Sequence, residues 1–188
     1  MTNKIWCYRT LALSLTLVFV AALSQLAAPV TRARQRVGLL TVTGMVKVNG
    51  QPAATGDIVA SGSDVQTAKG SSAVVSLGKL GRVEVHAEST MKLSYTDSGI
   101  VVSMLEAGRV RISSSSGTSA QATTNDGEVV ATGPSVNEFK IDTSCGNTFV
   151  AVKQGRVELR AGGSVKQIAA GSQDSAGTAN PGCTPGRG

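Results

Sequence analysis

Apolar and polar residues alternate in short runs along the chain from Gly38 onward. Clear examples are VEV at 83–85, MKLSY at 91–95 and RVRI at 109–112. A period of two places successive side chains on opposite faces of a β-strand. Glycine-rich turn signals separate the runs, and no stretch after residue 38 has a helical period. The pattern predicts an all-β fold of many short strands, either sandwich-like or a short irregular β-helix, with the sandwich favoured.

A five-residue pattern, Gly-Arg-Val-charged-aliphatic, occurs at 81–85, 108–112 and 155–159. We interpret each copy as a turn followed by the opening of a half-buried strand. The glycine takes a positive φ, and the valine and the aliphatic residue face the core. A solvated strand face is favoured for the arginines, with an anion-binding cluster of Arg82, Arg109 and Arg156 as the alternative. Structural turns are expected at Gly50, Gly56, Gly81, Gly108 and Gly155.

The first 30 residues differ in pattern from the rest. Residues 1–9 are short and basic, and residues 10–30 carry no charge. Such a segment predicts an apolar helix that serves as a signal peptide or a membrane anchor. The small residues of Ala22-Leu23-Ser24 favour cleavage after Ser24, whereas a run of 21 residues is close to the length of a spanning helix. We favour cleavage. With either outcome we expect residues 39–188 outside the cytoplasm: periplasmic, secreted or anchored in the inner membrane.

The net charge of +6 and the pI of 9.6 are unevenly distributed along the chain. Residues 39–175 contain 12 Lys plus Arg and 12 Asp plus Glu, so this part is neutral. Three arginines of the excess lie in a basic linker at 31–38. Nucleic-acid binding needs a basic face on the folded surface, and we therefore expect no nucleic-acid partner.

Two cysteines, Cys145 and Cys183, follow the apolar run. An even count in an exported chain predicts a disulfide. The bond would close a loop of 39 residues and would contribute about 3–4 kcal/mol on the chain-entropy model. It would tie a Gly/Pro-rich tail at 174–188 to a β domain at 39–173. Two free thiols are the alternative.

Sequence signals for catalysis are absent. His86 is the one histidine. Glu84, His86 and Glu88 alternate onto one strand face and could bind a metal weakly, but a solvated face is favoured. No nucleophile elbow, phosphate-binding loop or zinc-protease motif occurs. We therefore expect a protein that is not an enzyme and has no cofactor and no metal.

The segment from Val42 to Tyr95 resembles the FecR domain family. Its V-x-V-N-G strand pair, G-D-x-V turn and T-x-x-x-S-x-A-x-V strand carry the resemblance, which LEAGRVRI, TFVAVKQGRVEL and QIAAGSQ extend over residues 39–173. The matching positions are Val46, Val48, Asn49, Gly50, Gly56, Asp57, Val59, Thr67, Ser71, Ala73, Val75, Gly81, Val83, Ser89 and Leu93.

The resemblance implies an extracytoplasmic β domain used for protein or envelope contacts. The family's namesake regulators are inner-membrane proteins with a cytoplasmic region that binds a sigma factor. Nine residues precede the apolar run here, so we do not expect that region or its signalling role. We expect an exported domain that binds or scaffolds an envelope protein in the bacterial periplasm or at the cell surface. It would contact the membrane through residues 10–30 if they are retained. A carbohydrate- or cell-wall-binding module is the alternative, with Tyr95, Phe139 and Phe149 as the available aromatic residues.

Overall fold

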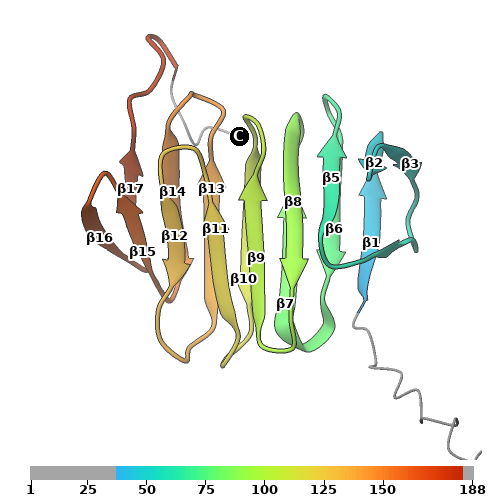
Figure 1. Cartoon of the computed structure of the whole chain (residues 1–188), viewed down its shortest axis with the longest axis horizontal. Coiled ribbons are helices and arrows are strands. Elements are labelled where there is room, and N and C mark those ends of the chain that lie inside the picture. Colours follow the sequence, from blue (N-terminus) through green and yellow to red (C-terminus); the bar gives the residue numbers. More distant parts are fainter. Residues whose placement is uncertain (1–36, 184–188) are drawn as a thin grey trace, which may run out of the picture. The chain divides into compact units, whose positions relative to one another are not determined.

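The computed structural model describes residues 37–183 and folds them into two β-sheets (Figure 1). Residues 1–36 and 184–188 lie outside the described part. The predicted N-terminal apolar helix, almost all of the basic linker and the end of the tail therefore lie outside it too. Within residues 37–183, no helix has the length and apolar character that crossing a bilayer requires.

One sheet has eight strands and the other has nine. In spatial order the eight-stranded sheet contains β17 (Gln173–Ala176), β14 (Thr148–Gln154), β13 (Asn137–Asp142), β10 (Arg109–Ser114), β7 (Gly81–Val85), β6 (Ser72–Ser76), β1 (Gly38–Thr43) and β4 (Ile58–Val59). The nine-stranded sheet contains β16 (Ser164–Ala169), β15 (Arg156–Ala161), β12 (Glu128–Ala131), β11 (Ser119–Thr123), β9 (Gly99–Met104), β8 (Ser89–Tyr95), β5 (Ser63–Thr67), β2 (Val46–Val48) and β3 (Gln51–Ala53). The helical element among these residues is a 3₁₀ turn, η2 (Gly78–Leu80).

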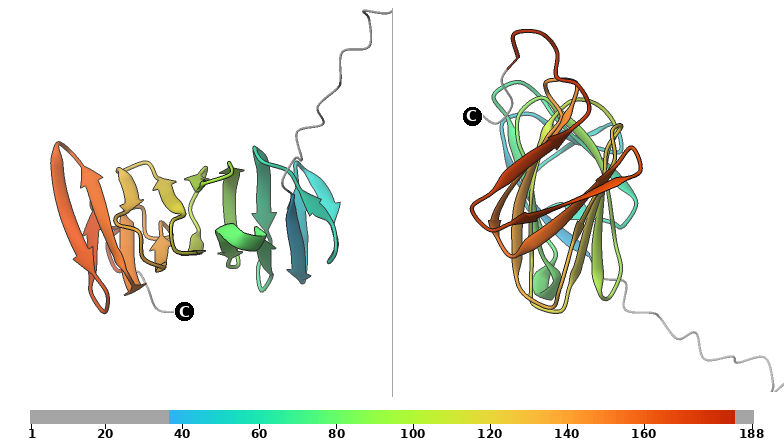
Figure 2. Two further views of the ribbon diagram at one scale, coloured as in Figure 1. Left: turned by 90° about the horizontal axis from the view of Figure 1, so that it is seen from below. Right: turned by 90° about the vertical axis from the view of Figure 1, so that its left-hand side faces the viewer.

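The chain passes back and forth between the sheets and adds one strand or one hairpin at each pass. Apart from β3 and β4, which form the outer edges at the N-terminal end, both sheets therefore follow chain order from β1 and β2 to β16 and β17 at the other end (Figures 1 and 2). Among the described strands, neighbours pair antiparallel except β9 and β11. The all-β prediction is confirmed. Of the two arrangements left open, the structure has the two-sheet one, because parallel stacking is confined to that single pair.

Side chains that face the space between the sheets form one aliphatic core. Burial alternates along the strands as the sequence pattern predicts. In β8, for example, Met91 and Leu93 are fully buried, whereas Lys92 between them is not. Phe139 is the largest fully buried side chain. The core is aliphatic because only six aromatic residues occur in the whole chain.

The sheets extend past both predicted boundaries of the domain. β1 begins at Gly38, and β17 ends at Ala176, where it pairs with β14. The expected start of the Gly/Pro-rich tail at residue 174 is therefore wrong by three residues. The alternation of β17 is too short for a sequence pattern to separate this strand from the tail that follows.

Candidate interaction surfaces

The three Gly-Arg-Val copies open β7, β10 and β15, and their valines are buried. The arginines do not gather. β7 and β10 are antiparallel with Arg82 opposite Ser113, so Arg82 and Arg109 lie at opposite ends of the pair. Arg156 belongs to the other sheet. The anion-binding cluster is therefore wrong, because it assumed that the three strands stack in parallel register.

The predicted turn glycines divide into two kinds. Gly50, Gly56, Gly81 and Gly155 have φ values of 78°, 99°, 127° and 84°, in the region that favours glycine. Gly108 does not have a positive φ, so the reason given for it is wrong. A Cβ at Gly108 would lie 2.7 Å from the Cα of Ser89. Close approach of two chain segments accounts for this glycine.

Glu84, His86 and Glu88 do not share a strand face. The chain leaves β7 after Val85, and Glu88 lies in the crossover to β8 with a φ of 55°. Burial, and after it the charges of Arg111 and nearby basic residues, lowers the pKa of His86. Within residues 37–183, no group of three His, Cys, Asp or Glu side chains is placed to hold a metal.

The aromatic residues are placed for packing rather than for stacking on a sugar. Tyr95 is 6% exposed and Phe139 is 1% exposed. The Tyr95 hydroxyl donates to the Val59 carbonyl at 2.6 Å and accepts from the Gly38 N–H at 3.0 Å. Phe149, in β14, is half-buried. A sugar-binding platform needs an exposed ring face, and only Phe149 of these three offers part of one.

A disulfide joins Cys145 to Cys183 with a Cα–Cα distance of 5.6 Å. The bond holds residues 177–183 against the loop before β14. The Asn180 N–H donates to the Cys145 carbonyl at 2.8 Å, and a Cβ at Gly146 would touch the Asn180 side chain. This part of the predicted tail is thus fixed to the domain.

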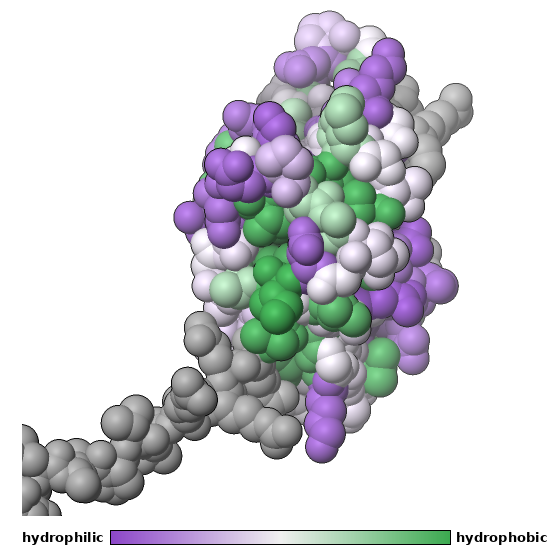
Figure 3. Space-filling view, turned by 90° about the vertical axis from the view of Figure 1, so that its right-hand side faces the viewer, coloured by the Kyte–Doolittle hydropathy of each residue, from purple (hydrophilic) through white to green (hydrophobic). Residues whose placement is uncertain are grey.

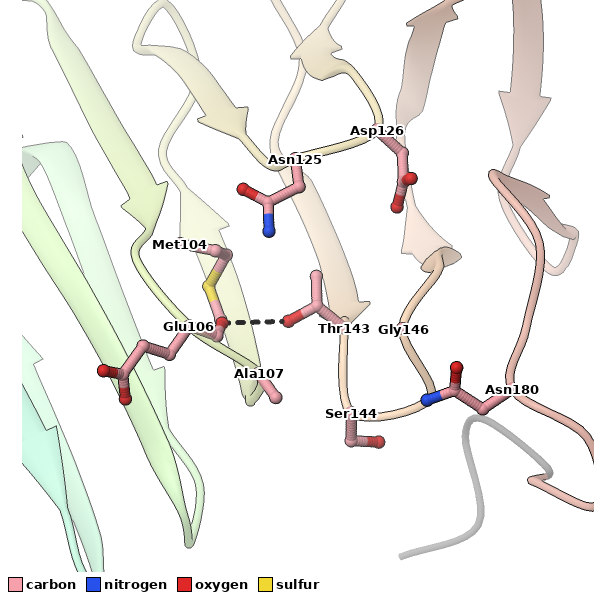
Figure 4. Close-up of a pocket in the computed structure, with 9 residues that line it drawn as sticks. All are labelled: Met104, Glu106, Ala107, Asn125, Asp126, Thr143, Ser144, Gly146 and Asn180. Carbon is pink, nitrogen blue, oxygen red and sulfur yellow. Dashed lines mark hydrogen bonds between the residues drawn. The ribbon is translucent and has the colours of Figure 1, made fainter.

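Beside the disulfide lies a polar cavity of about 220 Å³ (Figure 4). One of its carboxylates, Asp126, accepts a hydrogen bond from the Thr148 hydroxyl at 3.0 Å. The Thr143 hydroxyl donates to the Glu106 carbonyl at 3.3 Å. These hydrogen bonds connect the loops that meet here.

The C-terminal end of the sandwich offers an open backbone edge. β16 has six residues, and all but Ile168 are exposed. Lys166 faces inward, opposite Leu159, and its ammonium reaches Asp174 Oδ1 and the Ser175 carbonyl of β17, each at 2.9 Å. The hydrogen bond from Lys166 is the first cause of the lowered pKa of Asp174. Lys166 thus closes the end of the core and leaves the backbone of β16 uncovered.

A shallow depression of about 680 Å³ lies beside β16 on the outer face of its sheet. Gln167 and Ala169 of β16 form one side, and Arg156 and Glu158 of β15 form the floor. The loop at 132–135 closes the other side. An edge strand with an adjoining depression can bind an extended peptide through its backbone and hold its side chains in the depression.

The N-terminal end offers apolar side chains instead of a long edge. Its edge strands are β4, with two residues, and β3, with three residues including Pro52. Short edges and proline protect a sheet from strand addition. Val37, Leu39 and Ile58 are 52%, 54% and 64% exposed here. We call these three residues the apolar end.

The sequence pattern identified neither the open edge of β16 nor the apolar end. Leu39 alternates with the buried Leu40, so its outward direction could have been inferred from the period of two. Ile58 and Lys166 lie in strands of two and six residues whose place at a sheet edge depends on pairing with distant segments. No local signal in the sequence indicates that pairing.

Comparisons with known proteins support the fold. No protein-family model and no curated protein matches the chain. Two crystal structures of a "putative anti-sigma factor" from Parabacteroides distasonis ATCC 8503, at 2.50 Å and 1.65 Å, are similar, each with a TM-score of 0.52 and 19% identity. The match covers 65% of this chain and 57% of the other, so the chain spans little more than half the length of that protein. At this identity the likeness shows the fold alone, and the chain shares its all-β architecture with part of that anti-sigma-factor structure.

Proposed function

We propose that the chain is an exported, non-enzymatic binding domain of the FecR type whose partner is a protein of the bacterial envelope. The fold shared with the Parabacteroides anti-sigma-factor structures supports the FecR type, since an anti-sigma factor is a regulator. The apolar run at 10–30 and the Cys145–Cys183 bond support a place outside the cytoplasm, where disulfides persist.

The open edge of β16 is the observation on which the binding role rests. Ala161 and Ser164 close a two-residue turn, Gly162-Gly163, in which both glycines have positive φ. In such a hairpin the closing pair exchanges two hydrogen bonds, and hydrogen-bonded pairs alternate from there. The N–H groups of Val165, Gln167 and Ala169 therefore point away from β15. They are donors for a strand of a partner protein.

Charge on the outer face of the eight-stranded sheet disfavours nucleic acid as the partner. On the eight-stranded sheet, Glu84 lies 2.9 Å from Arg82 and 3.6 Å from Arg111. Glu138 pairs with Lys153 at 3.1 Å. Basic side chains on this face thus have acidic neighbours, and phosphate binding needs an uncompensated basic surface. The burial of Tyr95 and Phe139 likewise disfavours the carbohydrate-binding alternative.

Proline at Gln167 is expected to weaken partner binding while the domain stays folded. The substitution removes an N–H that does not pair with β15, and edge strands tolerate proline at such positions. Loss of a donor worth about 1–1.5 kcal/mol lowers affinity about tenfold. The measurement is in-cell photocrosslinking from a benzoyl-phenylalanine at position 169, with the captured protein identified by mass spectrometry.

The matched control is Gln167→Ala, which changes the side chain and keeps the N–H. Its crosslinked product is expected at full intensity, and a probe at Gln121 in the middle of the nine-stranded sheet is expected to give none. Equal products in the proline and alanine variants, with both folded by circular dichroism, would rule out strand addition at β16.

A further inference from the structure

We propose that the apolar end rests on the surface of a lipid bilayer. Leu39 of β1 and Ile58 of β4 are direct cross-strand partners, and both are exposed on the outer face of the sheet. Val37 directly precedes β1 and is also exposed. Their neighbours Leu40 and Val59 are fully buried in the core. The exposed side chains point the other way and do not pack in the core.

Hydrophobic residues gather at this end of the molecule. Figure 3 views the molecule from this end and shows hydrophobic residues running through its middle, with hydrophilic residues on both sides. The nearest acidic side chain in sequence is Asp57, whose carboxylate accepts the Ala54 N–H at 2.8 Å within the turn. At the opposite end of the sandwich, Lys166 and Asp174 cover the gap between the sheets with charge. The two ends of the described domain therefore differ in the charge of their exposed side chains.

The size of the patch indicates lipid rather than a second copy as its occupant. A stable protein–protein interface buries about 800 Å² and about 20–30 residues on each partner. The apolar end has three exposed large hydrophobic residues. A small apolar patch of this kind gives a weak membrane contact, which becomes lasting when a second membrane signal lies beside it.

That second signal lies in the sequence directly before the patch in the alternative in which the run at 10–30 is retained as a membrane anchor. Residues 31–36 separate the uncharged run at 10–30 from Val37. Six residues span at most about 20 Å, so a run that remains in the bilayer keeps Val37 close to the lipid surface. Arg32, Arg34 and Arg36 lie in this linker, and arginines beside a membrane attract anionic headgroups.

The contact would involve one end of the domain and leave the other end free of lipid. β16 belongs to the end of the nine-stranded sheet opposite β2 and β3. At about 4.8 Å per strand, a stack of nine strands separates the two ends by roughly 40 Å. The open edge proposed to bind a partner would then lie at the other end of the sheets from the lipid contact. The lipid contact does not depend on the role of β16.

Tryptophan fluorescence in vesicles tests the proposal. The full chain carries two substitutions. Trp6→Phe removes the one native tryptophan, and Ile58→Trp places a single tryptophan in the apolar end. The chain is reconstituted into vesicles of phosphatidylglycerol and phosphatidylcholine with bromine on the upper acyl carbons. Because a side chain of an interfacial patch enters about 5–10 Å below the headgroups, the emission of the indole introduced at position 58 is expected to shift to the blue and to fall by roughly half or more.

The matched control is Val165→Trp in the same Trp6→Phe chain, at a position that is 59% exposed at the other end of the domain. Its emission is expected to be the same with and without bromine. Leu39→Trp provides a second probe if the Ile58→Trp variant does not give the native circular dichroism spectrum.

Emission at position 58 or 39 that is unshifted and unquenched would overturn the proposal. A blue shift without quenching by bromine would also overturn it, because the patch would then be covered by a second copy or by residues 1–36. Equal quenching at positions 58 and 165 would show that neither end of the domain faces the lipid preferentially, and it would also overturn the proposal.

Discussion

Replacing Phe139 by alanine is expected to lower the free energy of unfolding by about 3–5 kcal/mol, the usual cost of removing a buried aromatic ring. Phe139 is 1% exposed and is the largest fully buried side chain of the described part. It lies in β13 between Ile112 of β10 and Val152 of β14. Aliphatic strand residues on a fixed sheet cannot move in to fill the space, so most of the ring volume would remain as a cavity.

Phe149→Ala is the matched control, because it removes the same ring from the next strand. Phe149 is half-buried and lies opposite Asp142 and Ser175. Its loss is expected to cost about 1 kcal/mol, as for a partly exposed side chain. The measurement is urea unfolding of both variants, followed by circular dichroism. Equal losses would show that the ring of Phe139 is not at the centre of the core.

Breaking the Cys145–Cys183 bond is expected to lower the free energy of unfolding by about 3–4 kcal/mol on the chain-entropy model. The cysteines are 38 positions apart, and reduction frees that loop in the unfolded chain. The folded state also loses an anchor, since Cys183 holds residues 177–183 against the loop that contains the buried Cys145. Urea unfolding with and without a reducing agent measures the difference.

The double variant Cys145→Ser/Cys183→Ser separates the bond from side effects of the reductant. Its unfolding midpoint is expected to match that of the reduced protein and to be insensitive to reductant. A free-thiol titration of the unfolded, unreduced protein cleaved after Ser24, which lacks Cys7, gives a second check. Two reactive thiols from Cys145 and Cys183, with an unchanged midpoint on reduction, would contradict the bond.

The alternation of apolar and polar residues predicts most of the strands of the fold. It places Val83, Val110 and Val157 toward the core and predicts strands rather than helices, because a period of two is a local property of the backbone. The positive φ of Gly81 and Gly155 also follows from local turn chemistry. These features depend on residues within one strand and its adjoining turn.

Features that depend on which strands meet could not be predicted in this way. The arginines of the three Gly-Arg-Val copies separate because β7 and β10 are antiparallel and β15 lies in the other sheet. Gly108 is needed because Ser89 passes close to it. Leu39 becomes part of an apolar end only because Ile58 pairs with it. Each of these contacts joins residues that are 19 or more positions apart.

Hydrogen exchange of the backbone amides of β16, measured by NMR on the purified protein, tests most directly whether its edge is free to accept a partner strand. The amides of Lys166 and Ile168, which point toward β15, are expected to be protected. Those of Val165, Gln167 and Ala169 are expected to exchange at least about tenfold faster, because nothing in the described domain covers them. Equal protection along all of β16 would contradict the account, because the edge would then already be occupied.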